Sequence, residues 1–297
     1  MLRALHFSDV HVDVSPLRIP LWDWRLKRVL GGANHALRRA PRFRRARRKL
    51  AALARFREQV GADLVLCTGD YTVLGTAPEM RAARLAVDGL TKAPAFATTP
   101  GNHDLYLPDG VAEARFEGAF GAFLESDLPG LAAGDGAWPL VRLIGDDAAV
   151  VALCSARPNP PFWRSSGVHG RPQLAAFYRA LAHPELQRRF LFVLTHYAPR
   201  LADGQVDSAL HRMVDAEPFL DACRGIARGT VLHGHVHDCF RLDLPGLAAP
   251  IHGAGSATQE KREGFWLFDV ERAGGTARRG YWDGQAYRLT DEAHPLP

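Results

Sequence analysis

Aspartate, asparagine and histidine side chains follow a series of short apolar segments in this sequence. Three histidines lie within residues 231–237, VLHGHVH, directly after one such segment. Neighbouring histidines are often only packed or solvated, so their meaning depends on matching residues elsewhere. The matching residues at the segment ends form the set Asp9, His11, Asp70, Asn102, His103, His196, His235 and His237. Carboxylate, amide oxygen and imidazole together suit Mn, Fe, Zn, Co or Ni, so the set indicates metal chemistry.

The apolar segments are short and continuous, which is typical of strands buried on both faces. They are Leu2–Phe7, Asp63–Cys67, Ala93–Thr98, Phe190–Leu194 and Gly229–Leu232. Ligands of open α/β sheets bind at the carboxyl ends of the strands, which is where the polar residues stand. A spacing of two, as between Asp9 and His11, also places two side chains on one face of an extended chain. No segment ends in a serine or cysteine nucleophile elbow, which disfavours covalent catalysis.

The elements between these strands predict the fold class. Residues Arg47–Val60 have one apolar face with helical spacing and end at Gly61, and a second helix is predicted over Glu79–Leu90. Strand–helix–strand order implies right-handed crossovers and a parallel or mixed sheet. Later, Gly-Asp-Asp at residues 145–147 predicts a hairpin, and short strands are predicted at Phe265–Val270 and Gln285–Leu289.

No internal repeat, low-complexity linker or clear domain boundary divides the 297 residues. Two packed sheets with outer helices fit this order of elements best. We therefore expect one α/β domain over residues 1–297, a four-layer α/β/β/α sandwich of two mixed sheets flanked by helices. A basic and apolar helical insertion is expected at about residues 16–50.

The polar residues also occur as a series of motifs in a fixed order. The motifs are Asp9-Val10-His11, Gly69-Asp70, Gly101-Asn102-His103-Asp104, His196 and Gly234-His235-Val236-His237. This series resembles the calcineurin-like metallophosphoesterase superfamily over residues 9–237, about three-quarters of the chain. The stretch GVHGRPQLAAFYRAL resembles the family's Gly-x-x-Gly-x-x-Gln-Leu entry into a helix. One departure is HYAP, in which Tyr197 stands where relatives often have a second histidine.

The resemblance implies a binuclear metal site, with every ligand position of the motifs present. Its implied assignment is Asp9, His11 and His237 on one ion, Asn102, His196 and His235 on the other, and Asp70 bridging both. The ions would be divalent or trivalent, and Mn or Fe is favoured. Two such ions share a hydroxide and stabilise an in-line displacement at phosphorus.

The resemblance also implies two catalytic residues beside the ligands. His103 would stabilise the equatorial oxygens of the phosphoryl group or protonate the leaving oxygen. Asp104 would orient the His103 ring and raise its pKa. The implied reaction is hydrolysis of a phosphodiester or pyrophosphate bond.

Charge and composition limit the location and partners of the chain. The net charge is +5, yet 13 Lys and Arg and no acid lie between Trp24 and Arg57, which leaves a net charge of −8 elsewhere. One basic segment on an acidic remainder disfavours a general nucleic-acid binder. No apolar run is long enough to span a bilayer, and the N-terminus is a strand pattern, not a signal peptide. Four scattered cysteines, at 67, 154, 223 and 239, favour reduced thiols and a cytoplasmic location.

Two interpretations of the 16–50 insertion remain open. As a helix, it would place Trp22, Leu26, Val29 and Leu30 on one face and Arg28 on another. This face could pack on the core and leave the arginines solvated. Alternatively, the insertion could cap the site and grip an anionic substrate or the anionic inner face of a membrane.

The substrate is likewise open between several classes. Superfamily enzymes that cleave a lipid-linked sugar nucleotide of the UDP-diacylglucosamine type resemble this plan, with an apolar and basic insertion as a lipid cap. A cyclic-nucleotide phosphodiesterase is a second possibility, whereas nuclease and protein phosphatase activities are disfavoured. Outside enzymes, the chain could be a non-catalytic metal-binding scaffold.

Overall fold

The computed structural model describes residues 1–134, 136–159, 161, 163–272 and 274–297, and in these residues the strands form two six-stranded mixed sheets. The first sheet has the order β12 (Tyr287–Leu296), β11 (Gly274–Trp282), β10 (Phe265–Glu271), β1 (Leu2–Phe7), β2 (Leu64–Cys67) and β3 (Ala95–Thr98). The second has the order β4 (Leu140–Ile144), β5 (Ala148–Ala152), β6 (Phe190–Leu194), β7 (Gly229–His233), β9 (Ile251–Ala254) and β8 (Cys239–Leu242).

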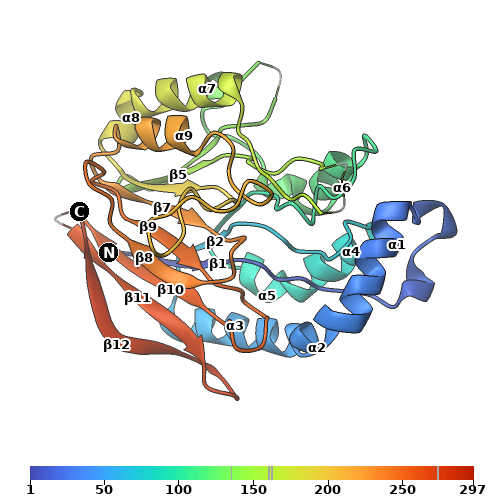
Figure 1. Ribbon diagram of the computed structural model, residues 1–297. Coiled ribbons are helices and arrows are strands. Elements are labelled where there is room, and N and C mark those ends of the chain that lie inside the picture. The colour runs from blue at the N-terminus through green and yellow to red at the C-terminus, as the bar shows by residue number, and fades with distance from the viewer. Residues whose placement is uncertain (135, 160, 162, 273) are drawn as a thin grey trace.

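Helices cover the outer face of each sheet (Figure 1). The first sheet is covered by α3 (Ala46–Val60), α4 (Ala77–Ala86), α5 (Asp88–Thr91) and α6 (Ala112–Phe120). The second is covered by α7 (Arg171–Leu181), α8 (Pro184–Gln187) and α9 (Ala216–Cys223). The predicted α/β fold of two mixed sheets flanked by helices is confirmed.

Three apolar layers hold these elements together. The layer between the sheets contains Leu66, Phe192 and Phe268, all buried. Outer layers pack α3 on the first sheet through Leu50 and α7 on the second through Phe177, among others. Each such side chain contributes about 1.5–3 kcal/mol when it leaves water.

Strand register brings the ends of the central strands to one edge. In the first sheet β1, β2 and β3 are parallel, and Phe7, Cys67 and Thr98 pair in one row. In the second, β6 and β7 are parallel, and Leu194 pairs with Leu232. Because parallel strands share a direction, the loops that follow all five strands leave from the same edge of the sandwich.

Several element boundaries differ from the sequence predictions. The helix predicted over Glu79–Leu90 is two helices, α4 and α5, and α4 begins earlier because Thr76 and Glu79 form a capping box. The predicted strand Gln285–Leu289 extends to Leu296 in β12. Strand β12 pairs with β11 over a long antiparallel ladder. These hydrogen bonds extend the strand beyond the residues whose sequence pattern alone predicts it.

The 16–50 insertion consists of short helical pieces that project beside α4 (Figure 1). They are η1 (Pro16–Arg18), η2 (Leu21–Asp23), α1 (Leu26–Asn34), the π-helical turn η3 (His35–Arg39) and α2 (Ala40–Phe43), before α3. Leu26 and Val29 of α1 are exposed, and Arg28 is 1% exposed. The packed apolar face with solvated arginines is therefore not found in α1. Within the described residues, no helix is both long and apolar enough to cross a bilayer.

Arg28 sets the orientation of α1 because its buried guanidinium is hydrogen-bonded to acceptors inside the protein. It donates to Asp23 Oδ1 at 2.8 Å and to the carbonyls of Leu74 at 2.9 Å and Gly75 at 3.0 Å. Arg115 reaches the same Asp23 oxygen at 2.6 Å. A buried guanidinium that keeps all its partners holds a fixed geometry, so α1 cannot rotate its apolar face inward.

We predict that two histidines between the sheets make the fold sensitive to acid. Burial lowers the pKa of His6 to about 3 and holds that of His252 well below its usual value. Below pH 6.5 these histidines are therefore protonated in the unfolded chain but neutral in the folded chain. The free energy of unfolding consequently decreases as the pH is lowered. In urea titrations with a chelator present, the free energy of unfolding should fall by about 1 kcal/mol per histidine between pH 7.0 and 5.5.

The matched variant is His252→Asn, which removes one titrating group in the same interior. Its free energy of unfolding should fall less than that of the wild type over this pH interval. An equal fall in both proteins would contradict the assignment to His252.

Candidate metal centre

The predicted ligands stand in the loops that leave the shared sheet edge. Asp9 and His11 follow β1, Asp70 follows β2, and His235 and His237 follow β7. These five residues have left-handed backbone conformations, with φ between 46° and 69°. Such a conformation costs a residue other than glycine about 1–3 kcal/mol and is concentrated at functional sites. Each turn breaks the strand direction and points the side chain into a common centre.

One group of ligand-type side chains comprises Asp9, His11 and His237, whose ligand atoms converge. Asp9 Oδ1 is 3.0 Å from His237 Nε2 and 3.7 Å from His11 Nε2. The two Nε2 atoms are 3.1 Å apart. The phenyl ring of Phe43, from α2, packs on the His11 ring at 4.9 Å between centroids.

A second group comprises Asn102, His196 and His235. Asn102 Oδ1 lies 3.0 Å from His196 Nε2 and 3.0 Å from His235 Nδ1. The other ring nitrogen of His235 lies 3.2 Å from the carbonyl oxygen of His211. His235 therefore presents Nδ1 to the group, whereas His196 presents Nε2.

Asp70 lies between the two groups. Its Oδ2 is 3.7 Å from His11 Nε2 in one group and 3.5 Å from His196 Nε2 in the other. Although burial opposes ionisation, His196 and His103 hold the pKa of Asp70 well below its usual range. In return, against the effect of burial, Asp70 raises the pKa of His196 to about 9. The position of Asp70 thus attracts positive charge from both sides.

The hydrogen bonds around the centre leave its inner atoms free to bind a cation. His11 Nδ1 and His196 Nδ1 donate to the carbonyls of Thr72 at 3.1 Å and Thr68 at 2.7 Å, which turns each Nε2 atom inward. His237 Nδ1 contacts Gln259 Oε1. Asp9 Oδ1, fully buried, makes no hydrogen bond to any described residue. Buried acceptors that face one another without a donor are stabilised by a metal ion, so these residues fit a cation pair.

Two glycines allow the loops of the centre to approach this closely. A Cβ on Gly101 would lie 2.1 Å from Asp70 Oδ1, and one on Gly69 would lie 2.4 Å from the Gly101 nitrogen. Both distances are impossible for a real side chain. The two glycines therefore fix the Asp70 carboxylate against the loop that carries Asn102.

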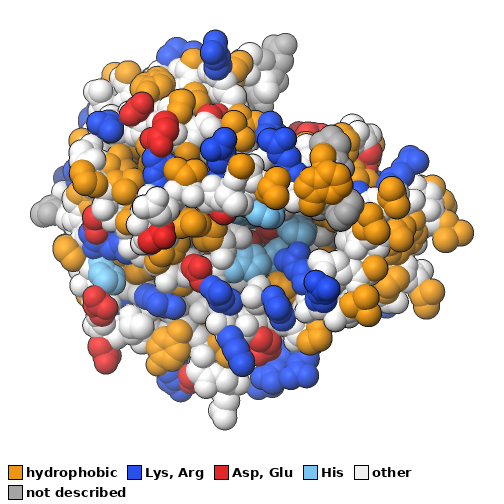
Figure 2. Space-filling view, viewed as in Figure 1, with side chains coloured by type: hydrophobic (Ala, Val, Ile, Leu, Met, Phe, Trp, Pro, Cys, Tyr) orange, Lys and Arg blue, Asp and Glu red, His pale blue; other side chains and the backbone are white. Residues whose placement is uncertain are grey.

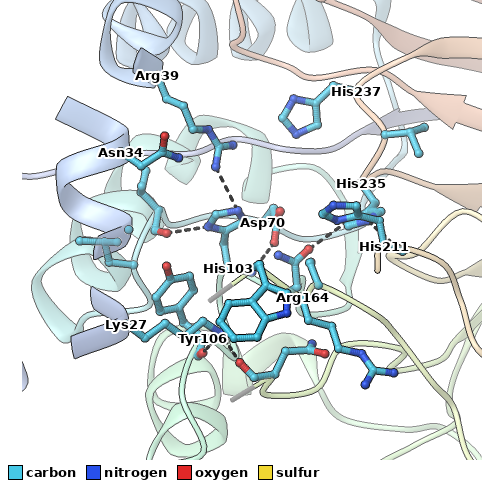
Figure 3. Close-up of a pocket in the computed structure, with 18 of the residues that line it drawn as sticks. Lys27, Asn34, Arg39, Asp70, His103, Tyr106, Arg164, His211, His235 and His237 are labelled. Carbon is cyan, nitrogen blue, oxygen red and sulfur yellow. Dashed lines mark hydrogen bonds between the residues drawn. The ribbon is translucent and has the colours of Figure 1, made fainter. Parts of the chain in front are cut away.

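His103 lies at the centre, but its ring is held differently from our expectation. The backbone N–H of His103 donates to Asp70 Oδ1 at 2.8 Å, and its Nδ1 donates to the Val73 carbonyl at 2.6 Å. Arg39 Nη1 is 3.4 Å from His103 Nε2 (Figure 3). Burial, with Arg39 adding to it, lowers the pKa of His103 well below its usual value. The raised pKa that we expected is not found.

Asp104 holds the loops instead of the His103 ring. Its Oδ1 accepts from the backbone N–H groups of Tyr71 at 3.0 Å and Thr72 at 3.1 Å. Its Oδ2 accepts from the N–H of Gly101 at 2.9 Å. Burial raises the pKa of Asp104 to about 7, with Asp70 adding to the effect. Asp104 therefore links the loop after β2 to the loop after β3. The His103 ring is hydrogen-bonded to the Val73 carbonyl instead of to Asp104.

A cavity of about 760 Å³ opens over the centre and carries excess positive charge. Figure 2 shows its histidines at the base of a hollow with Lys and Arg side chains around it. The basic residues that line it are Lys27, Arg39, Arg42, Arg157, Arg164 and Arg262, whereas Asp70 is the acidic residue among its described lining. Lys27 joins the insertion to the far wall by donating to the carbonyls of Tyr106 at 2.9 Å and Asn159 at 2.6 Å.

Arg39 and Gln259 reach the centre without any motif that marks them. Arg39 is one of 13 basic residues in its segment, and only the π-helical turn η3 decides that it points inward. Gln259 lies 22 residues after His237, in a loop. The composition of the insertion predicted a basic group near the site, but neither residue could be chosen from the sequence.

Three histidines outside the ligand set lie in the interior. The side chain of His6 is 3.0 Å from Thr68 Oγ1, and His233 is fully buried. His169 is also buried, and its Nε2 lies 3.0 Å from Thr195 Oγ1. Tyr197, the departure from the family pattern, packs against His235 with tilted rings and 4.1 Å between centroids.

A model of the calcineurin-like phosphoesterase family matches residues 2–239. The chain belongs to this family. The predicted family membership is therefore confirmed. The family is one of dimetal phosphoesterases. No curated protein sequence is similar enough to this chain to count as a relative.

Solved structures share the fold of this family member. A dimetal phosphatase from Danio rerio is 14% identical with a TM-score of 0.63, and the match covers 99% of this chain and 98% of that one. The purple acid phosphatase PPD1 from yellow lupin seeds is 12% identical with a TM-score of 0.61, over 97% of this chain and 53% of that one. At sequence identities this low, the structural similarity shows a shared fold only.

We predict that Asp70→Asn abolishes binding of both metal ions, because this carboxylate lies between the two groups. Element analysis after dialysis against Mn²⁺ and gel filtration should find less than one ion per chain. The matched control is Asp13→Asn, since Asp13 is half-exposed and pairs with His35 outside the centre. That variant should keep the wild-type metal content. Retention of two ions by a folded Asp70→Asn protein would contradict the central position of Asp70.

Proposed function

We propose that this chain hydrolyses a phosphodiester or pyrophosphate bond with the help of two metal ions. Asp9, His11 and His237 would hold one ion, and Asn102, His196 and His235 the other, with Asp70 between them. Bound metal pairs supply an activated water nucleophile and polarise the phosphoryl oxygens. The observation that carries the proposal is the convergence of these side chains around Asp9 Oδ1, a buried oxygen that makes no hydrogen bond to a described residue.

The residues above the ligands support a phosphoryl substrate. Arg39 and His103 stand side by side over Asp70, within the cavity. A guanidinium presents several charged donors to the phosphate oxygens of a bound substrate. His103 would contact the transferred group or the leaving oxygen, and the Val73 carbonyl fixes its ring orientation.

The cavity supports a substrate larger than a phosphomonoester. It holds about 760 Å³, and its basic residues lie on several walls, from Lys27 on α1 to Arg262 near the end of the chain. A diester or pyrophosphate places groups on both sides of phosphorus and would use more than one wall. These features favour the diester and pyrophosphate classes over a small monoester.

A lipid-linked sugar nucleotide is the second candidate substrate, because apolar side chains join the basic wall. Leu30, Leu74 and Tyr106 line the cavity beside Lys27 and Arg39. An anionic headgroup with an apolar tail would match both kinds of lining. A cyclic nucleotide would use only the metal and basic part, so relative turnover of the two substrates separates the candidates.

The test of the reaction is turnover of bis-p-nitrophenyl phosphate with Mn, Fe, Zn, Co or Ni supplied. The wild-type protein should show metal-dependent hydrolysis. His103→Ala should keep both metals and lose at least 100-fold in kcat, the usual scale for a positioned acid or base. A wild-type protein that holds two ions yet cleaves no mono- or diester would instead favour the non-catalytic scaffold.

Arg39 should contribute mainly to binding of the anionic substrate. Loss of a charge-assisted hydrogen bond is worth about 1.5–3 kcal/mol, so Arg39→Ala should lower kcat/KM by about 10- to 100-fold, mostly through KM. The matched control is Arg38→Ala, which removes the neighbouring, exposed guanidinium from the same turn. Steady-state kinetics on the diester measure both. Equal effects of the two variants would contradict a specific role for Arg39.

A further inference from the structure

Large hydrophobic side chains are exposed together in one stretch of the insertion. In the described part of the chain, seven of 16 such exposed residues fall within residues 17–37. They are Leu17, Leu21, Trp22, Leu26, Val29, Leu30 and Leu37, with exposed fractions from 37% to 96%. Single exposed apolar residues are ordinary, but a cluster of this kind marks an interaction surface. We refer to residues 17–37 as the docking surface.

Helix α1 shows that this exposure is built into the fold. Leu26, Val29, Leu30 and Ala33 follow helical spacing on one face, and all four are exposed. Arg28, on the opposite face, is buried among its acceptors. The helix is thus reversed relative to an ordinary surface helix, whose apolar face packs inward. Because the Arg28 contacts fix the rotation of the helix, its apolar face stays exposed and available to a partner.

The charge of the docking surface identifies that partner. Arg18 and Arg25 are exposed within it, and the exposed Arg38 directly follows it. Asp23 is its single acidic residue, and that carboxylate is buried and paired with Arg28. A symmetric contact with a second copy would bring these positive charges together. The surface is complementary to a partner that is apolar inside and anionic at its boundary.

We propose that the docking surface binds the face of an anionic lipid bilayer. Trp22 and the leucines enter the boundary between headgroups and acyl chains, where a tryptophan ring has both apolar and polar neighbours. The arginines extend to the lipid phosphates, and each such charge adds to binding at low salt. Apolar area and charge act together, so neither alone supplies the full affinity.

The bound orientation follows from residues shared with the cavity. Leu30 belongs to the docking surface and also lines the metal cavity, as does Lys27 one turn earlier. Figure 2 shows hydrophobic side chains over the insertion beside the hollow that contains the histidines. A bilayer seated on the docking surface therefore lies next to the mouth of the cavity. The inference needs no particular reaction at the metal centre.

Vesicle sedimentation tests the inference with the full chain. Vesicles of phosphatidylcholine with 30% phosphatidylglycerol should pellet the protein at low salt, and binding should weaken at least tenfold on pure phosphatidylcholine or at high salt. Trp22→Ser combined with Leu26→Gln should lower the partition coefficient on anionic vesicles at least tenfold. The matched control is Leu85→Gln, since Leu85 is 74% exposed on α4, outside the docking surface. It should bind as the wild type does.

A second measurement reports insertion directly. Brominated acyl chains should quench tryptophan fluorescence of the wild type, and Trp22→Phe should remove that quenching. No pelleting with anionic vesicles at low salt would overturn the proposal, as would equal binding by the Trp22→Ser, Leu26→Gln protein. Dimerisation that this double variant abolishes, without vesicle binding, would assign the surface to a second copy instead. Vesicle binding by a protein without phosphoesterase activity would support this inference while refuting the proposed reaction.

Discussion

The structure depends on holding carboxylate oxygens and imidazole nitrogens close together around one centre. Asp9, Asp70 and the inward Nε2 atoms of His11 and His196 face this centre, and Asp9 Oδ1 makes no hydrogen bond among the described residues. The surrounding backbone sustains this arrangement. Carbonyl oxygens fix the imidazoles from behind, left-handed turns aim the side chains, and the tightly packed sheets keep the turns in place. A pair of bound cations would relieve the resulting repulsion between the carboxylates.

The sequence predicted the parts of the site that follow from strand register. Short apolar runs indicated parallel strands, and parallel strands end at one edge, so polar residues such as Asp9 and His235 had to meet. Contacts made by loops could not be foreseen in this way. Asp104 binds backbone N–H groups of a neighbouring loop instead of the His103 ring, because the exact path of that loop decides which donors come within reach. Arg39 depends on a single π-helical turn, which composition does not indicate.

The insertion presents basic side chains to the metal cavity and apolar side chains to the outside. Its basic side chains reach the metal cavity through Lys27 and Arg39, and its apolar side chains face outward through Leu26 and Val29. Arg28 makes this division possible. By filling the interior with a charged group that keeps all its hydrogen bonds, it leaves the apolar face of α1 without a place in the core. One buried ion pair thus decides which side of the helix meets the cavity wall and which meets solvent.

The pairing of β1 with β10 has a consequence for how the chain matures. Leu2 pairs with Val270, and His237 completes the group of side chains that begins at Asp9. The first strand and the ligand-type residues that follow it therefore reach their native contacts only when these later residues are present. During synthesis on the ribosome, β1 can pair with β2 early, but its other edge stays unpaired until β10 has emerged. A metal ion held by Asp9, His11 and His237 could therefore bind only after the loop that follows β7 has been synthesised.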